Sequence, residues 1–68
     1  MARVDGQEVK VGDYVSFKCD IEQSGRIKKI VQGNRGPRLL LESLYGFHGD
    51  YIGGETEHYE DAVDCWLD

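Results

Sequence analysis

The chain lacks any long apolar run, and its opening residues, MARVDGQEVKVGD, contain no apolar stretch of the kind found in signal peptides. We therefore expect a cytoplasmic protein without a membrane span. The sequence has 68 residues, which is enough for one small domain but not for separate catalytic and cofactor domains. It accordingly predicts a single non-enzymatic domain over residues 1–68.

Cysteine is scarce: Cys19 and Cys65 are the only two, and neither belongs to a C-x-x-C pair. In a cytosolic chain, isolated cysteines usually pack as small apolar residues, and burial lowers thiol reactivity. Together with His48 and His58 they are the residue types of a tetrahedral zinc site, but their spacing matches no zinc-finger pattern. The sequence predicts no metal site, no cofactor and no catalytic residue.

Basic residues are absent from the last third of the chain. Residues 46–68 contain seven acids and no Lys or Arg, whereas residues 1–45 hold all eight basic residues and six acids. One interpretation is a solvated acidic half that keeps a small protein soluble. The other is a polarised surface whose acidic side meets a basic partner, with basic turns elsewhere.

Proline occurs once, and glycines separate short apolar runs, which favours strands joined by turns. Val15, Phe17 and Cys19 alternate at period two and predict a half-buried strand. Val9 and Val11 share their parity, so we expect them to face inward as well. The polar segment DIEQSG is predicted to connect this strand to the next.

The following run, RIKKIVQ, predicts a second strand in which a β-bulge near Lys28–Lys29 brings both Ile27 and Ile30 to the core. GNRGPR is the strongest turn signal in the chain and predicts a hairpin tip. RLLLESL predicts a third strand. Its leucines fall on both faces, so we expect the C-terminal segment or a second subunit to cover the outer one.

The segment YGFHGDYIGGE has four glycines and predicts a long, packed loop rather than disorder. The C-terminal segment fits either a helix or a strand. We favour a short turn near Tyr59–Ala62, followed by a strand from Val63 to Leu67.

The order of these parts resembles the opening of SH3-like barrels such as the tudor and KOW families. VKVGDYVSFKC contains their GD-x-V entry and first strand, SGRIKKI their G-x-I/V second strand, and RLLLES follows. The short length and the closing DCWLD are similar to small bacteriophage-encoded barrel proteins. The resemblance covers residues 9–44, and the last six residues loosely. It implies an all-β, SH3-like barrel of four to five antiparallel strands with one long Gly/aromatic loop.

Two candidate surfaces follow from these patterns. Aromatic residues crowd the acidic half and predict a binding surface for a basic protein partner: Tyr45, Phe47, Tyr51, Tyr59 and Trp66. The alternative is a KOW- or tudor-like nucleic-acid-binding module, in which Tyr14 or Phe47 stacks on bases beside a basic turn made of Arg26, Lys28, Lys29, Arg35 and Arg38. A homodimer is a further open prediction.

Overall fold

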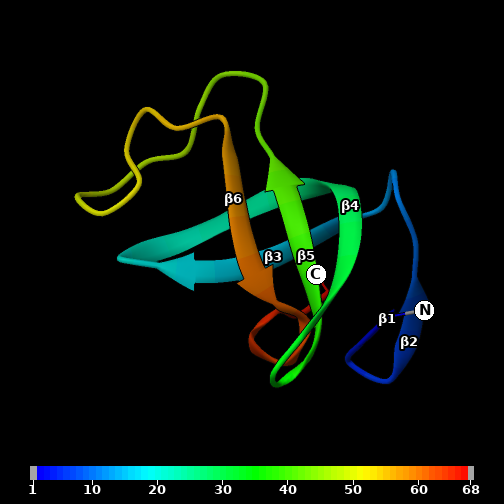
Figure 1. Ribbon diagram of the computed structural model, residues 1–68. Coiled ribbons are helices and arrows are strands. Elements are labelled where there is room, and N and C mark those ends of the chain that lie inside the picture. The colour runs from blue at the N-terminus through cyan, green and yellow to red at the C-terminus, as the bar shows by residue number, and fades with distance from the viewer. Residues whose placement is uncertain (1, 68) are drawn as a thin grey trace.

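The computed structural model describes residues 2–67 as two antiparallel sheets and one short 3-10 helix (Figure 1). The smaller sheet pairs β1 with β2, and the larger has the strand order β3-β4-β5-β6. The elements are β1 (Ala2–Val4), β2 (Gln7–Val9), β3 (Tyr14–Cys19), β4 (Ile21–Gly33), β5 (Gly36–Glu42), β6 (Glu57–Asp61) and the 3-10 helix η1 (Ala62–Asp64). Residues 2–67 contain no helix of the length and apolarity that a membrane crossing requires.

The N-terminal hairpin was not predicted, although the sequence carries its signal. Asp5 and Gly6 both adopt positive φ, at 53° and 76°, as a two-residue type I′ hairpin turn requires. The hairpin buries Val4 and Val9 against the main sheet. The prediction that Val11 faces inward is wrong, because Val11 lies in the turn between β2 and β3 and is exposed.

The alternation predicted for β3 is confirmed, since Val15 and Phe17 are buried and Cys19 packs against the core. The predicted polar connection, however, is not a loop. β4 begins at Ile21, and Asp20 alone turns the chain, with φ at 73°. Aspartate tolerates this left-handed conformation, so the polar residues that follow can pair directly with β3.

The predicted bulge in β4 is confirmed. The register with β5 shifts between Ile27 and Lys29, so Lys28 is the extra residue; Ile27 is fully buried and Ile30 packs on the core. β4 curls through this region, so its first half pairs with β3 and its second half with β5 (Figure 1). As a result β3 crosses behind β5 and β6, and their inner faces enclose the core.

The predicted hairpin tip lies at the turn between β4 and β5, and the strand over RLLLE is confirmed as β5. Leu39 and Leu41 are fully buried, whereas Leu40 is only partly covered. Leu44 lies beyond the end of β5 and is 84% exposed, so the C-terminal segment does not cover it; coverage by a second subunit stays a prediction.

The prediction for the C-terminal segment has the order of its parts reversed. The strand, β6, comes first and pairs with β5, and η1 follows it. Of the predicted strand at residues 63–67, Trp66 forms an isolated bridge to Ser16, in which each backbone N–H donates to the other's carbonyl oxygen at 2.8 and 2.9 Å. Pairing of β6 with β5 places the His58 ring against the Phe17 ring, with the ring centroids 5.4 Å apart. This stacking favours residues 57–61, rather than 63–67, as the strand beside β5.

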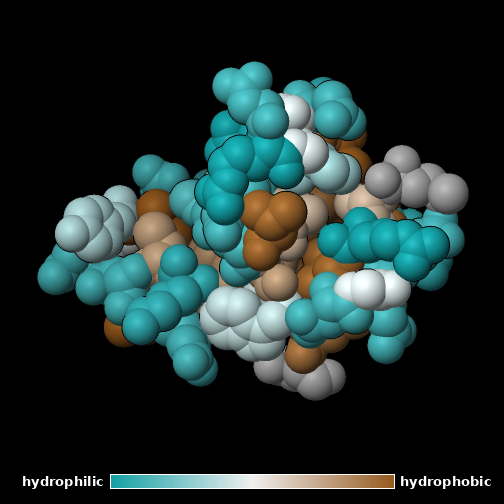
Figure 2. Space-filling view, turned by 90° about the horizontal axis from the view of Figure 1, so that it is seen from below, coloured by the Kyte–Doolittle hydropathy of each residue, from teal (hydrophilic) through white to brown (hydrophobic). Residues whose placement is uncertain are grey.

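The all-β prediction is confirmed, and residues 2–67 form six strands rather than four or five. The core is one cluster that joins both sheets, the long loop and η1: Ala2, Val4, Val9, Val15, Phe17, Ile27, Leu39, Leu41, Phe47, Ile52, Ala62 and Cys65. Seen from the end that carries η1 and the β4–β5 turn, hydrophilic side chains cover most of the surface, and apolar ones form small separate groups (Figure 2).

Candidate binding surfaces

The long loop between β5 and β6 folds back on itself. Ser43 N–H donates to the Thr56 carbonyl oxygen at 2.9 Å, and Phe47 N–H donates to the Glu55 carbonyl oxygen at 2.7 Å. Gly54 N–H in turn donates to the Phe47 carbonyl oxygen at 2.9 Å. These bonds give residues 43–56 a defined path, in agreement with the predicted packed loop.

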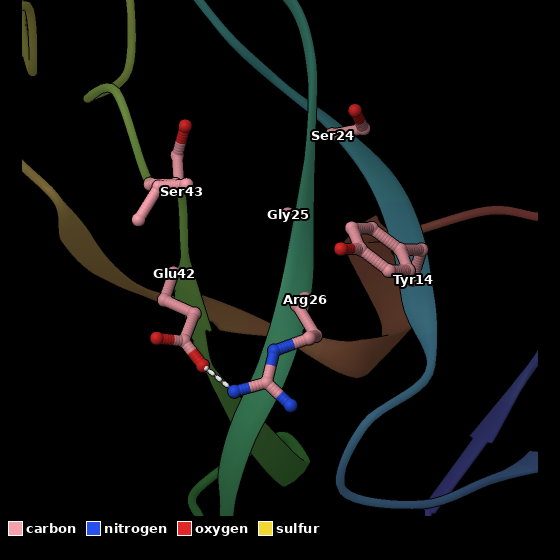
Figure 3. A pocket seen from close by; sticks show the side chains of 7 residues that line it. Tyr14, Ser24, Gly25, Arg26, Glu42 and Ser43 are labelled. Carbon is pink, nitrogen blue, oxygen red and sulfur yellow. Dashed lines mark hydrogen bonds and ion pairs between the residues drawn. The ribbon is translucent and has the colours of Figure 1, made fainter.

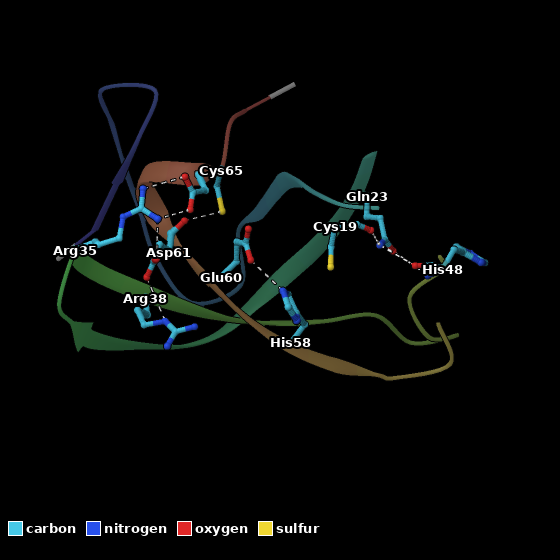
Figure 4. A network of polar contacts seen from close by, with 10 residues as sticks. Cys19, Gln23, Arg35, Arg38, His48, His58, Glu60, Asp61 and Cys65 are labelled. Atoms are coloured by element: carbon cyan, nitrogen blue, oxygen red, sulfur yellow. Dashed lines mark hydrogen bonds and ion pairs between the residues drawn. The ribbon is translucent and has the colours of Figure 1, made fainter. Parts of the chain in front are cut away.

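The same loop is hydrogen-bonded to the β3–β4 hairpin through the side chain of Gln23 (Figure 4). His48 N–H donates to Gln23 Oε1 at 2.8 Å, while Gln23 Nε2 donates to the His48 carbonyl oxygen at 2.9 Å and to that of Cys19 at 3.1 Å. Asp50 N–H donates to Asp20 Oδ2 at 2.7 Å. The backbone of the loop is therefore hydrogen-bonded both to the strand residue Gln23 and to Asp20 in the β3–β4 turn.

Phe47 belongs to the core rather than to a binding surface. Its side chain is 4% exposed, and its ring meets that of Phe17 edge to face at a centroid distance of 5.4 Å. The sequence placed Phe47 among the partner-binding and base-stacking residues because composition alone does not say which loop aromatic points inward. Its burial removes it from both candidate surfaces.

The other four predicted aromatic residues do not form one surface. Tyr45 and Tyr51 lie on the loop and are 93% and 79% exposed. Tyr59 lies on β6 under the guanidinium of Arg38, 5.6 Å from the ring centroid, and is less exposed. Trp66 is half-buried at the outer edge of β3. Only Tyr45 and Tyr51 are large, freely presented loop aromatics.

Carboxylates surround the end of the molecule where the loop meets the β3–β4 turn; we call Asp20, Asp50 and Glu55 together the acidic loop end. Within residues 2–67 none of the three forms an ion pair. The pKa of the Cys19 thiol is raised, first by burial and then by the charges of Glu60, Asp20 and Glu55. Asp50 and Glu55 come from the acidic segment 46–68 and Asp20 from the β3–β4 turn, so this local concentration of negative charge only partly follows the distribution of acids along the sequence.

The predicted basic surface is largely neutralised by ion pairs. Arg26 pairs with Glu42, and Lys28 pairs with Glu57, whose hydrogen bond raises the pKa of the lysine. Arg35 lies 3.0 Å from an oxygen of Asp64, and Asp61 forms ion pairs with both Arg35 and Arg38, at 3.3 and 3.2 Å (Figure 4). Of the five predicted residues, only Lys29 has no ion pair among residues 2–67. Glu57, Asp61 and Asp64 belong to the acidic half of the sequence, so the interpretation of a surface with separate acidic and basic sides is wrong in this region.

The four residues weighed as a zinc site do not come together. Within the described chain, no group of three or more His, Cys, Asp or Glu side chains is placed to hold a metal ion. His58 Nε2 lies 3.0 Å from Glu60 Oε1, and the thiol of Cys65 donates to the Asp61 carbonyl oxygen at 3.5 Å. Burial, followed by the charges of Glu60, Asp64 and Asp61, raises the pKa of Cys65 to about 12, so this thiol stays protonated at neutral pH.

A hollow on the outer face of β3 and β4 was not predicted as a site. It has a volume of about 370 Å³, and its lining includes Tyr14, Leu44 and the ion-paired Arg26 and Glu42 (Figure 3). Ser24, Gly25 and Ser43 complete its lining. The alternation along β3 predicts that Tyr14 lies on the outer face of the sheet, and this could have indicated a surface site there.

The comparisons with known proteins give no relative to set beside these surfaces. No protein-family model matches the chain, and no curated protein or solved structure matches it either. The functional argument accordingly depends on the residues of this chain.

Proposed function

We propose that the protein is a non-enzymatic interaction module that binds a basic protein partner through its long loop. The observation that supports it best is that the loop has a defined backbone path and carries solvent-exposed aromatic side chains. Phe47 and Ile52 anchor residues 43–56 in the core, while Tyr45 and Tyr51 project into solvent. The finer proposal, an SH3-like barrel of bacteriophage type, is based on the resemblance of the opening strands and is supported by the bridge from Ser16 to Trp66.

The loop has the properties of an energetic centre in a protein interface. Its backbone is already fixed by Gln23 and Asp20, so binding would lose little conformational entropy. Exposed tyrosines are enriched at such centres, and their ring faces attract Arg and Lys side chains. The adjoining carboxylates and the net charge of −5 would speed the approach of a basic partner.

The proposal can be tested with a fluorescein-labelled, nine-residue peptide of alternating Arg and Gly, followed by fluorescence anisotropy. We expect saturable, salt-sensitive binding that weakens about tenfold, or about 1.4 kcal/mol, in the Tyr45→Ser, Tyr51→Ser variant. Val63→Ser is the matched control, because Val63 is also an exposed apolar residue but lies on η1. Equal binding by all three proteins would refute the role of the loop.

The nucleic-acid alternative is weakened by the ion pairs, because phosphate binding by Arg35 or Arg38 would have to displace Asp61 and Asp64. A labelled single-stranded oligonucleotide in the same assay separates the two functions. We expect no binding at moderate salt. Tight binding that is lost on Lys29→Glu would favour the nucleic-acid function and count against the loop proposal.

A further inference from the structure

A second hollow adjoins the first on the outer face of β3 and β4. It has a volume of about 250 Å³, with Trp66 and Glu22 among its lining residues, and Ser16, Gln23 and Ser24 completing it. Ser24 also lines the 370 Å³ hollow that contains Tyr14 and Leu44. The two hollows are neighbours that share Ser24 in their linings, and together we call them the serine groove.

The groove exists because small residues lie opposite each other between larger ones. Ser16 pairs with Ser24 in the register of β3 and β4. On the same face, the flanking pairs are Tyr14 with Arg26 and Lys18 with Glu22. A row of short side chains between two rows of long ones leaves a depression that runs across the strands.

The two ends of the groove differ in chemistry. At one end, Glu22 is exposed and has no ion pair within residues 2–67, although Lys18 lies opposite it in the register. Trp66 is half-buried there, and its backbone is held by Ser16. At the other end, the charge of Arg26 is neutralised by Glu42, and the exposed side chains of Tyr14 and Leu44 form the walls.

We propose that the serine groove binds an extended, arginine-containing segment of the basic partner. The guanidinium of the partner's arginine lies between Trp66 and Glu22, because this planar cation stacks on an aromatic ring and forms a bidentate ion pair with a carboxylate. An apolar side chain two residues away lies between Tyr14 and Leu44, since residues i and i+2 of an extended segment point the same way. The site rests on the proposed function for its basic partner, but is a separate surface from the loop.

Short synthetic peptides test this site directly. The probes are two capped pentapeptides, Gly-Leu-Ser-Arg-Gly and Gly-Arg-Ser-Leu-Gly, titrated to millimolar concentration into ¹⁵N-labelled protein. We expect at least one of them to shift the indole N–H of Trp66 and the backbone N–H groups of Glu22 and Ser24 in a saturable manner. The same peptide with citrulline in place of arginine keeps the shape without the charge, and we expect at least tenfold weaker binding.

A matched pair of variants assigns the effect to the groove. Glu22→Gln removes the carboxylate and is expected to weaken binding of the arginine peptide at least tenfold. Glu8→Gln removes the same charge from an exposed position of β2 and is expected to leave the binding unchanged. Absence of shifts at the groove, equal binding of the citrulline peptide, or equal loss in both variants would overturn the proposal. The tyrosine variants of the loop affect only the loop surface, so their result separates failure of this site from failure of the proposed function.

Discussion

Gly25 faces the core from β4, at the position where a side chain would meet Phe47. A Cβ atom built there would lie 3.0 Å from Leu41 Cβ and 3.3 Å from a carbon of the Phe47 ring. Both neighbours are buried, and Leu41 Cβ is fixed to its backbone, so neither has room to retreat. The missing side chain of Gly25 is therefore what allows a residue from the long loop to complete the core.

We predict that Gly25→Ala lowers the free energy of unfolding by about 1–3 kcal/mol, the usual range for an overpacked core. The entropic gain of replacing glycine, about 0.4–1 kcal/mol, is too small to offset it. Urea unfolding measures the change. Ser24→Ala is the control, because Ser24 is the adjacent residue of the same strand and is exposed. A variant as stable as the parent would show that Phe47 can move away from Gly25.

The raised pKa of Cys65 has a consequence for stability at high pH. The folded thiol ionises only at about pH 12, whereas the unfolded one ionises at its ordinary value near 9.0. Between these values the unfolded state alone loses the proton, so the free energy of unfolding falls as pH rises from 9 to 12.

We predict that Cys65→Ala removes this contribution and flattens the pH dependence over that window, as measured by urea unfolding at each pH. Cys19→Ala is the control for a cysteine that is less buried. Identical slopes for the parent and Cys65→Ala would show that Cys65 does not contribute.

At the scale of elements, the strand pattern was readable because alternation reports burial directly. Val15, Phe17 and Ile27 were all correctly expected in the core. What the sequence did not reveal depends on partners that are distant along the chain. Phe47 points inward because Gly25, which has no side chain, leaves space for its ring. Residues 57–61 form the strand before η1 because His58 then stacks on Phe17.

For the candidate surfaces too, the sequence predicted the local features but not the contacts between distant segments. Composition located the acidic, aromatic loop, and Tyr45 and Tyr51 are exposed there. It could not show that Lys28, Arg35 and Arg38 meet the acids of β6 and η1, because the residues of those pairs lie 23 to 29 positions apart in the sequence. Nor could it show the serine groove, which requires the register of β3 against β4.

Gln23 joins two elements, so its removal should loosen one of them without unfolding the other. We predict that Gln23→Ala speeds hydrogen exchange at the His48 N–H at least tenfold, because that donor loses its acceptor. Gln32→Ala is the matched control, since Gln32 is an exposed glutamine of the same strand. Unchanged exchange at His48 would mean that the backbone bonds of the loop are sufficient to hold it.

For the whole molecule, charge pairing decides what the surface presents to polyanions. Asp61 forms ion pairs with Arg35 and Arg38 and therefore neutralises two of the basic residues. We predict that Asp61→Asn is retained on heparin to a higher salt concentration than Asp50→Asn. Both variants change the net charge equally, but Asp50 has no ion pair within residues 2–67. Equal elution would show that net charge alone governs the interaction.

The bridge between Ser16 and Trp66 also bears on how the chain reaches its fold. The outer edge of β3 receives its partner from 50 positions later in the sequence, and Leu67 N–H similarly donates to Asp5 Oδ2. A nascent chain that ends before these residues would expose an unpaired strand edge, the usual template for association between chains. Folding is thus expected to be completed only after synthesis of residue 67, so that products truncated before Trp66 aggregate more readily than a chain that contains both residues.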